Sequence, residues 1–98
     1  MKIPKQFTVG PTTYKVEWRH TIQNPAAMGR TYYRKKLVEI AKYDDFGNPF
    51  EQEEIDDTFW HELTHIILQD MGNDLTDNEN FVTAFANRLT QAVNSSKL

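Results

Sequence analysis

Residues 55–67 have the sequence IDDTFWHELTHII, and this stretch decides which kind of fold the chain adopts. Its apolar residues recur three or four positions apart, which is the spacing of one face of an α-helix. They are Ile55, Phe59, Leu63, Ile66 and Ile67. On a helical wheel, His61 and His65 fall nearly opposite this face, so the helix can bury its apolar side and still present both imidazoles to a cleft.

The sequence also indicates where this helix begins and ends. Asn48 and Pro49 have the form of a helix start, with Asn as the N-cap and Pro in the first position. The acidic residues within 51–57 suit the positive end of the helix dipole. Gly72 is the expected left-handed residue at the end of the helix. Residues 76–79 open a second helix, whose predicted apolar face consists of Phe81, Phe85, Leu89, Ala92 and Val93.

The residues before these helices are predicted to form strands. Apolar residues alternate with polar ones from Phe7 to Val9 and again from Tyr14 to Ile22, with a break at Gly10. We therefore expect a hairpin with one buried face. A second β signal lies within residues 30–43. Its basic residues 34–36 form either a turn or part of an exposed edge strand.

Strands followed by helices are typical of an α+β fold. We expect a small antiparallel or mixed sheet of three or four strands, packed with two C-terminal helices. The length of 98 residues predicts a single domain over residues 1–98, and an aromatic content of 12% argues against disorder. The chain has no cysteine, which excludes disulfides, cysteine-ligated metal sites and thiol catalysis.

Charge is distributed unevenly along the chain. Residues 1–42 carry nine Lys/Arg and two Glu (+7), whereas residues 43–98 carry two Lys/Arg and twelve Asp/Glu (−10). No basic motif interleaved with aromatic residues accompanies this charge, so nucleic acid is not the expected partner. No apolar run approaches the ~20 residues of a membrane span. The first eleven residues lack the apolar part of a secretion signal, and we expect a cytoplasmic protein without membrane contact.

His61, Glu62 and His65 form the pattern H-E-x-x-H. Residues four apart lie one turn above each other on a helix, so the two imidazoles can point at one metal ion. Glu62 is offset by about 100° on the wheel, which suits a general base beside the ion and not a ligand. In a zinc hydrolase such a glutamate takes a proton from the attacking water and later delivers it to the leaving amine.

A catalytic zinc ion needs a third protein ligand as well as an open position. Because cysteine is absent, the candidates are His, Asp and Glu, and Glu79 is favoured over Asp77. A capping box between Thr76 and Glu79 competes with this role, since a carboxylate bonded to the backbone of Thr76 is not free to ligate. Partners for the remaining histidine N–H groups are expected among Asp74, Asp77, Asn78 and Asn80.

Peptide hydrolysis also needs a donor that stabilises the negative charge developing on the carbonyl oxygen. The available donors are His20, Tyr32, Tyr33 and Tyr43. Tyr43 is the first choice, because it precedes the loop that leads into the helix with the two histidines. His20 falls on the apolar face of its predicted strand, where we expect a hydrogen-bonded core residue.

Taken together, these residues resemble a small gluzincin, a zinc metallopeptidase with an HExxH helix and a glutamate ligand on the next helix. More narrowly, the chain resembles the minimal metallopeptidase-like proteins of phages and prophages, which are related to ImmA/IrrE-type domains. The matching stretch runs from about Gly29 to Leu89. It contains GRTYYRKKLVEIA, a D-x-x-G-x-P loop, TFWHELTHIIL, and the segments Glu79-Asn80-Phe81-Val82 and Ala86-Asn87-Arg88-Leu89.

The resemblance implies a minimal zincin-like domain with zinc on His61, His65 and Glu79 and with Glu62 as the catalytic base. It implies a zinc-dependent endopeptidase whose protein or peptide substrate pairs, as an added strand, with an edge strand at Leu37–Ala41. The family's Tyr or His transition-state stabiliser has no matched position in this chain. The alternative function is therefore a non-catalytic, zinc-stabilised binding or regulatory module of the same fold.

Overall fold

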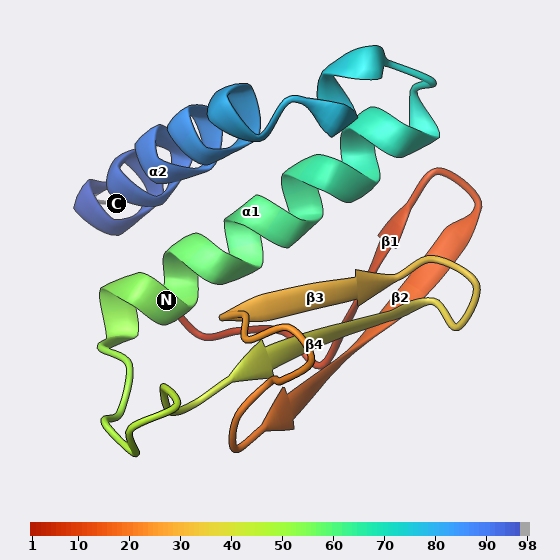
Figure 1. The fold of residues 1–98 in the computed structure, drawn as a ribbon. Helices are drawn as coiled ribbons and strands as arrows, with labels where there is room; N and C mark the ends of the chain where they lie inside the picture. Colours follow the sequence, from red (N-terminus) through yellow and green to blue (C-terminus); the bar gives the residue numbers. More distant parts are fainter. Residues whose placement is uncertain (97–98) are drawn as a thin grey trace.

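The computed structural model describes residues 1–96, so the last two residues of the predicted domain lie outside the described residues. It confirms an α+β fold, in which a four-stranded mixed sheet precedes two α-helices. The helix α1 (Gln52–Asp70) lies between the sheet and α2 (Glu79–Ser95), as Figure 1 shows. Of the helices in residues 1–96, none is long and apolar enough to cross a membrane.

The predicted hairpin is present. β1 (Gln6–Val9) pairs antiparallel with β2 (Thr12–Arg19), and Gly10 takes a φ of 55° in the turn between them. The expectation that His20 belongs to the core is wrong. β2 ends at Arg19, so His20 lies beyond the sheet, where it is exposed and stacks on Tyr43 with 4.4 Å between ring centroids.

The second β signal contains two strands. β3 (Gly29–Tyr32) and β4 (Leu37–Ala41) pair antiparallel, and β4 also pairs in parallel with β2, so the strand order is β1-β2-β4-β3. Residues 33–36 form the turn between them, with Lys36 at a φ of 54° and its N–H donating to the carbonyl of Tyr33. The basic residues 34–36 therefore form a turn and not part of an edge strand.

The prediction that Leu37–Ala41 is an edge strand is wrong. β4 has a neighbour on each side, and the edge strands are β1 and β3. β3 is the free edge that lies beside the HExxH stretch of α1. The physical reason lies in the composition of β4, in which Val38, Ile40 and Ala41 are almost completely buried and Glu39 is 8% exposed. A strand that is buried on both faces occupies the interior of a sheet.

α1 begins later than the Asn48-Pro49 pair predicts. Its N-cap is Glu51, which forms a capping box with Glu54, whereas Pro49 pairs with Tyr43 in an isolated bridge. The acidic side chains interact with the helix dipole, and those of Glu51 and Glu54 also accept hydrogen bonds from backbone N–H groups at the start of the helix. The predicted C-terminal signal is confirmed, because Gly72 follows the helix with a φ of 66°.

The core forms between α1 and the inner face of the sheet. Its buried members are Tyr14, Val16, Val38, Ile40, Phe59 and Ile66. Because successive strand residues point to opposite faces, Thr31 of β3 shares this inner face with its partner Val38. The strand that forms the free edge therefore directs a polar side chain toward α1.

The predicted apolar face of α2 meets α1 only in part, since Phe81 and Leu89 are half-buried at the margin of the contact. Val82, Ala86 and Thr90 are at most 1% exposed, whereas Phe85 is 47% exposed and Val93 is 37% exposed. Before α2, the chain turns through a short 3₁₀ helix, η1 (Asp74–Asp77).

Gly29 allows β3 to lie close against α1. A Cβ at this position would lie 2.5 Å from Cγ2 of Thr58, 3.3 Å from Cγ of Glu62 and 3.4 Å from the carbonyl oxygen of Glu39. Only a residue without a side chain fits such a contact. The closeness of the free edge strand to the helix with the HExxH pattern therefore depends on this glycine.

Replacing Gly29 with alanine should destabilise the fold by about 1–3 kcal/mol, because the new methyl group overpacks the contact between β3 and α1. Urea unfolding of Gly29→Ala beside the parent measures this loss. The substitution Thr58→Ser removes the methyl group in the way but keeps the hydroxyl that donates to the carbonyl of Glu54. The double variant should recover most of the stability. A Gly29→Ala protein as stable as the parent would contradict this packing.

Candidate metal centre

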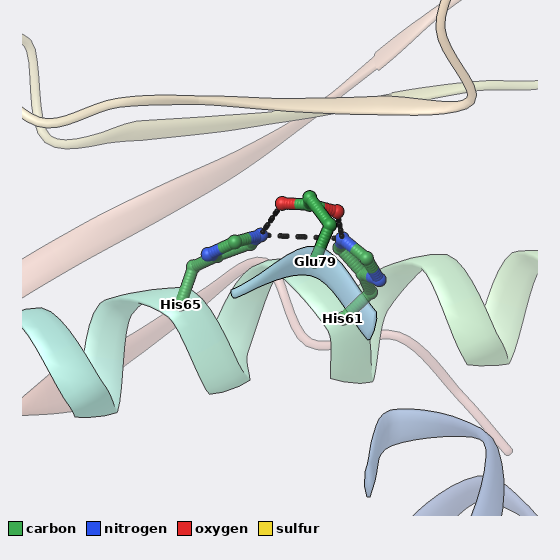
Figure 2. Close-up of side chains that lie close together, drawn as sticks. All are labelled: His61, His65 and Glu79. Atoms are coloured by element: carbon green, nitrogen blue, oxygen red, sulfur yellow. Dashed lines mark hydrogen bonds and ion pairs between the residues drawn. The ribbon is translucent and has the colours of Figure 1, made fainter. Parts of the chain in front are cut away.

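His61 and His65 lie one turn apart on α1 and point their Nε2 atoms toward each other (Figure 2). The two Nε2 atoms are 3.2 Å apart. Their side chains are 22% and 16% exposed, so each ring is held by its surroundings while one edge still faces the solvent. This is the arrangement that the four-residue spacing on the helix predicts.

Glu79 brings a carboxylate to both rings. Its Oε1 is 2.7 Å from Nε2 of His65, and its Oε2 is 3.2 Å from Nε2 of His61. The competing capping box with Thr76 is absent, because Asn78 is the N-cap of α2 and its side chain accepts from the N–H of Phe81. Glu79 is therefore the first residue of the helix, and its carboxylate is free to face the histidines.

The three side chains fit a divalent metal ion. One ligand atom from each of His61, His65 and Glu79 can be chosen so that all three lie within 4.8 Å of one another. Two ligands about 2.0–2.1 Å from a tetrahedral ion lie roughly 3.3 Å apart, close to the observed separations. Asp77, the alternative third ligand, is not part of this group. Three protein ligands also leave one position of a tetrahedron open.

The backbone of η1 orients His65. Nδ1 of His65 lies 2.8 Å from the carbonyl oxygen of Thr76, and the hydroxyl of Thr76 donates to the carbonyl of His65 at 3.1 Å. A carbonyl oxygen only accepts, so Nδ1 carries the hydrogen and, in the neutral ring, Nε2 keeps its lone pair for a metal. The sequence could not predict this partner, because every residue has a backbone carbonyl.

Glu62 lies beside the metal group but does not belong to it. The residue is only 9% exposed, and its Oε1 accepts a hydrogen bond of 2.7 Å from the hydroxyl of Thr31 on β3. It lines a cavity of about 510 Å³ together with His61, His65 and Glu79. Glu62 is offset from the two histidines around α1, as the sequence predicts for a general base. The sequence does not indicate this role for Thr31, since a lone threonine in a strand belongs to no functional motif.

Tyr33, one of the four candidate donors, lines the same cavity. Burial raises the pKa of the Tyr33 hydroxyl above its ordinary value, and this outweighs the opposite effect of a hydrogen bond with Thr76. The hydroxyl therefore keeps its proton at neutral pH. Tyr43, the first choice, does not line the cavity and instead stacks on His20. Tyr32 lies next to Tyr33, and Lys35 covers its ring at 5.2 Å from the centroid.

Comparison with protein-family models, with curated proteins and with solved structures finds no match to this chain. The resemblance to small gluzincins therefore stays a prediction from the residues themselves. The interpretation of the site depends on its geometry alone.

The parent protein should bind one equivalent of Zn²⁺, used as the probe ion. His61→Ala, His65→Ala and Glu79→Ala should each weaken binding by more than the roughly 10–100-fold that loss of a supporting partner costs. Asp77→Ala removes the same charge as Glu79→Ala but leaves the ligands intact, and should bind like the parent. Titration calorimetry and the metal content of the purified variants measure both effects. Equal binding by Glu79→Ala and the parent would contradict the assignment.

Proposed function

We propose that this protein is a zinc-dependent endopeptidase that hydrolyses peptide bonds of a protein substrate. The observation that carries the proposal is the convergence of His61, His65 and Glu79 in one cavity with the carboxylate of Glu62. A cluster of ligands alone would suit a structural ion. An additional carboxylate that is close to the group but not part of it is what hydrolysis requires. A cytoplasmic location of this activity stays a prediction.

Zinc is the proposed ion, because two imidazole nitrogens and one carboxylate oxygen form a ligand set of catalytic zinc sites. When bound, zinc would supply a Lewis acid that polarises the carbonyl of the substrate and lowers the pKa of water. His61 and His65 would hold the ion through Nε2, and Glu79 would neutralise part of its charge. The bond from His65 to the carbonyl of Thr76 keeps the ring from rotating.

Glu62 would act as the general base and later as the general acid. Its Oε1 is occupied by the hydroxyl of Thr31, which leaves Oε2 to take a proton from the attacking water. The same carboxyl group then gives this proton to the leaving amine, so that the nitrogen departs as a neutral amine. The hydrogen bond from Thr31 fixes the orientation of the carboxylate before the substrate arrives.

β3 offers the binding edge for an extended peptide. The N–H of Ala41 donates to the carbonyl of Met28 at 2.8 Å, so Met28 and Ala41 form a hydrogen-bonded pair. Such pairs alternate along an antiparallel ladder, and the N–H and C=O groups of Gly29 and Thr31 therefore point away from β4. Both residues line the cavity with the metal ligands. A substrate added to this edge as a fifth strand would pass beside Glu62.

Tyr33 supplies the donor that the resemblance left unmatched. The residue follows β3 directly and lines the cavity. Because its hydroxyl is protonated, it can donate to the carbonyl oxygen of the substrate as that oxygen gains negative charge. Hydrogen bonds that strengthen as charge develops lower the barrier of the chemical step.

Glu62→Gln should abolish cleavage of an unfolded protein substrate while zinc content remains at one equivalent. Glutamine has the same shape but cannot take up a proton, so only the chemical step is lost. Glu53→Gln, an exposed change in the first turn of the same helix, is the matched control and should cut like the parent. Cleavage is followed by electrophoresis with and without a chelator.

Cleavage by Glu62→Gln at the rate of the parent would contradict the mechanism. If zinc raises the melting temperature but neither protein cuts any substrate, the alternative of a non-catalytic zinc-stabilised binding module is favoured. The two functions are thus separated by one pair of assays on the same samples.

Tyr33→Phe should lower kcat by about 100-fold with little change in KM, because one donor to the charged oxygen is lost. Tyr32→Phe removes a hydroxyl from the neighbouring position, whose side chain points to the other face of β3, and should leave kcat unchanged. Steady-state kinetics on a fluorogenic peptide measure both variants. Equal effects of the two substitutions would exclude Tyr33 as the donor.

A further inference from the structure

The cleft continues along α1 beyond the metal ligands. A second cavity of about 300 Å³ shares Gly29, His61 and Glu62 with the first and is completed by Met28, Asp57, Thr58 and Thr83. β3 and α1 run in the same direction past both cavities, because Gly29 lies against Thr58 and Thr31 bonds to Glu62. A peptide along the edge of β3 would therefore pass over the second cavity before or after it reaches the ligands.

Asp57 places a negative charge in this second cavity. It lies four residues before His61, so Asp57, His61 and His65 follow one another along the same side of α1. The side chain is half-buried. Within residues 1–96, no nitrogen of a lysine, arginine or histidine lies within 4.0 Å of its carboxylate.

The remaining contact of Asp57 does not compensate this charge. The hydroxyl of Thr90 is 3.3 Å from Oδ1 of Asp57, but it lies closer, at 2.8 Å, to the carbonyl of Ala86. A hydroxyl has a single hydrogen, and the shorter contact takes it. The helix dipole does not account for Asp57 either, since α1 begins at Gln52 and the dipole acts within the first turn.

We propose that Asp57 is a specificity-determining residue that binds the lysine or arginine side chain of a substrate residue next to the cleaved bond. The inference rests on the proposed peptidase function and names its substrate class. The carboxylate of Asp57 has no cation beside it in residues 1–96, and a basic side chain from the substrate would pair with it through a charge-assisted hydrogen bond. Met28 and the methyl groups of Thr58 and Thr83 offer contacts for the aliphatic stem of such a side chain.

The distances agree with this assignment. Asp57 and His61 are one helical turn apart, about 5.4 Å along α1. An extended peptide rises about 3.3 Å per residue, so a residue one or two positions from the cleaved bond comes level with Asp57. Gly29 has no side chain to close the entrance from β3.

The test uses the zinc-loaded full chain and a mixture of peptides with randomised positions, with the cut sites identified by mass spectrometry. The parent should prefer Lys or Arg at one position next to the cut bond by about tenfold or more, the effect of one charge-assisted hydrogen bond. Asp57→Asn should lose this preference and still cut at uncharged residues. Asp45→Asn, which changes a carboxylate bonded to Gln23 in the loop before α1, is the matched control and should keep it.

Each other outcome overturns the inference in a recognisable way. If the parent cuts without a basic preference, or if Asp57→Asn keeps that preference, the inference fails and the peptidase function stands. If Asp57→Asn loses zinc, the carboxylate supports His61 and not the substrate, and the inference again fails. A library left intact by the zinc-loaded parent counts against the peptidase function and the inference together.

Discussion

The contact of the Glu79 carboxylate with the two imidazoles is the constraint on which the rest of the site depends. It joins α1 to the first turn of α2, and the chain between them is held by the reciprocal bonds of His65 and Thr76. With Nδ1 of His65 donating to a carbonyl, the Nε2 lone pair of that ring and the carboxylate of Glu79 face each other. A cation between them would relieve their mutual repulsion. The turn through η1 thus brings together side chains that could bind a metal ion.

The packing of α2 and the placement of its ligand follow from a single helical face. Glu79 is followed on this face by Val82, Ala86 and Thr90, at offsets of three, seven and eleven residues, and these three are the most deeply buried residues of α2. When they pack against α1, the carboxylate one turn earlier is directed at the histidines. Phe81 and Phe85 stack on each other beside this face and line an apolar pocket together with residues of α1.

Patterns that are local in the sequence were sufficient to predict the hairpin, both helices and the three side chains that meet in the candidate metal centre. The order of the strands was not predictable in the same way. A five-residue strand such as β4 gains its central place from pairing with β2, across a connection that no local pattern describes. The supporting roles of Thr31 and Thr76 were missed for a related reason. One is a common strand residue, and the other acts partly through its backbone carbonyl.

The misassigned edge strand also changes what the cleft can do. With β4 in the interior, the free edge belongs to β3, whose glycine lies against α1 and whose threonine holds the proposed base. A substrate strand paired with β3 would then meet the metal ligands, Glu62 and Tyr33 at once, since all of them line one cavity. The strand order therefore places a free backbone edge next to the candidate metal centre.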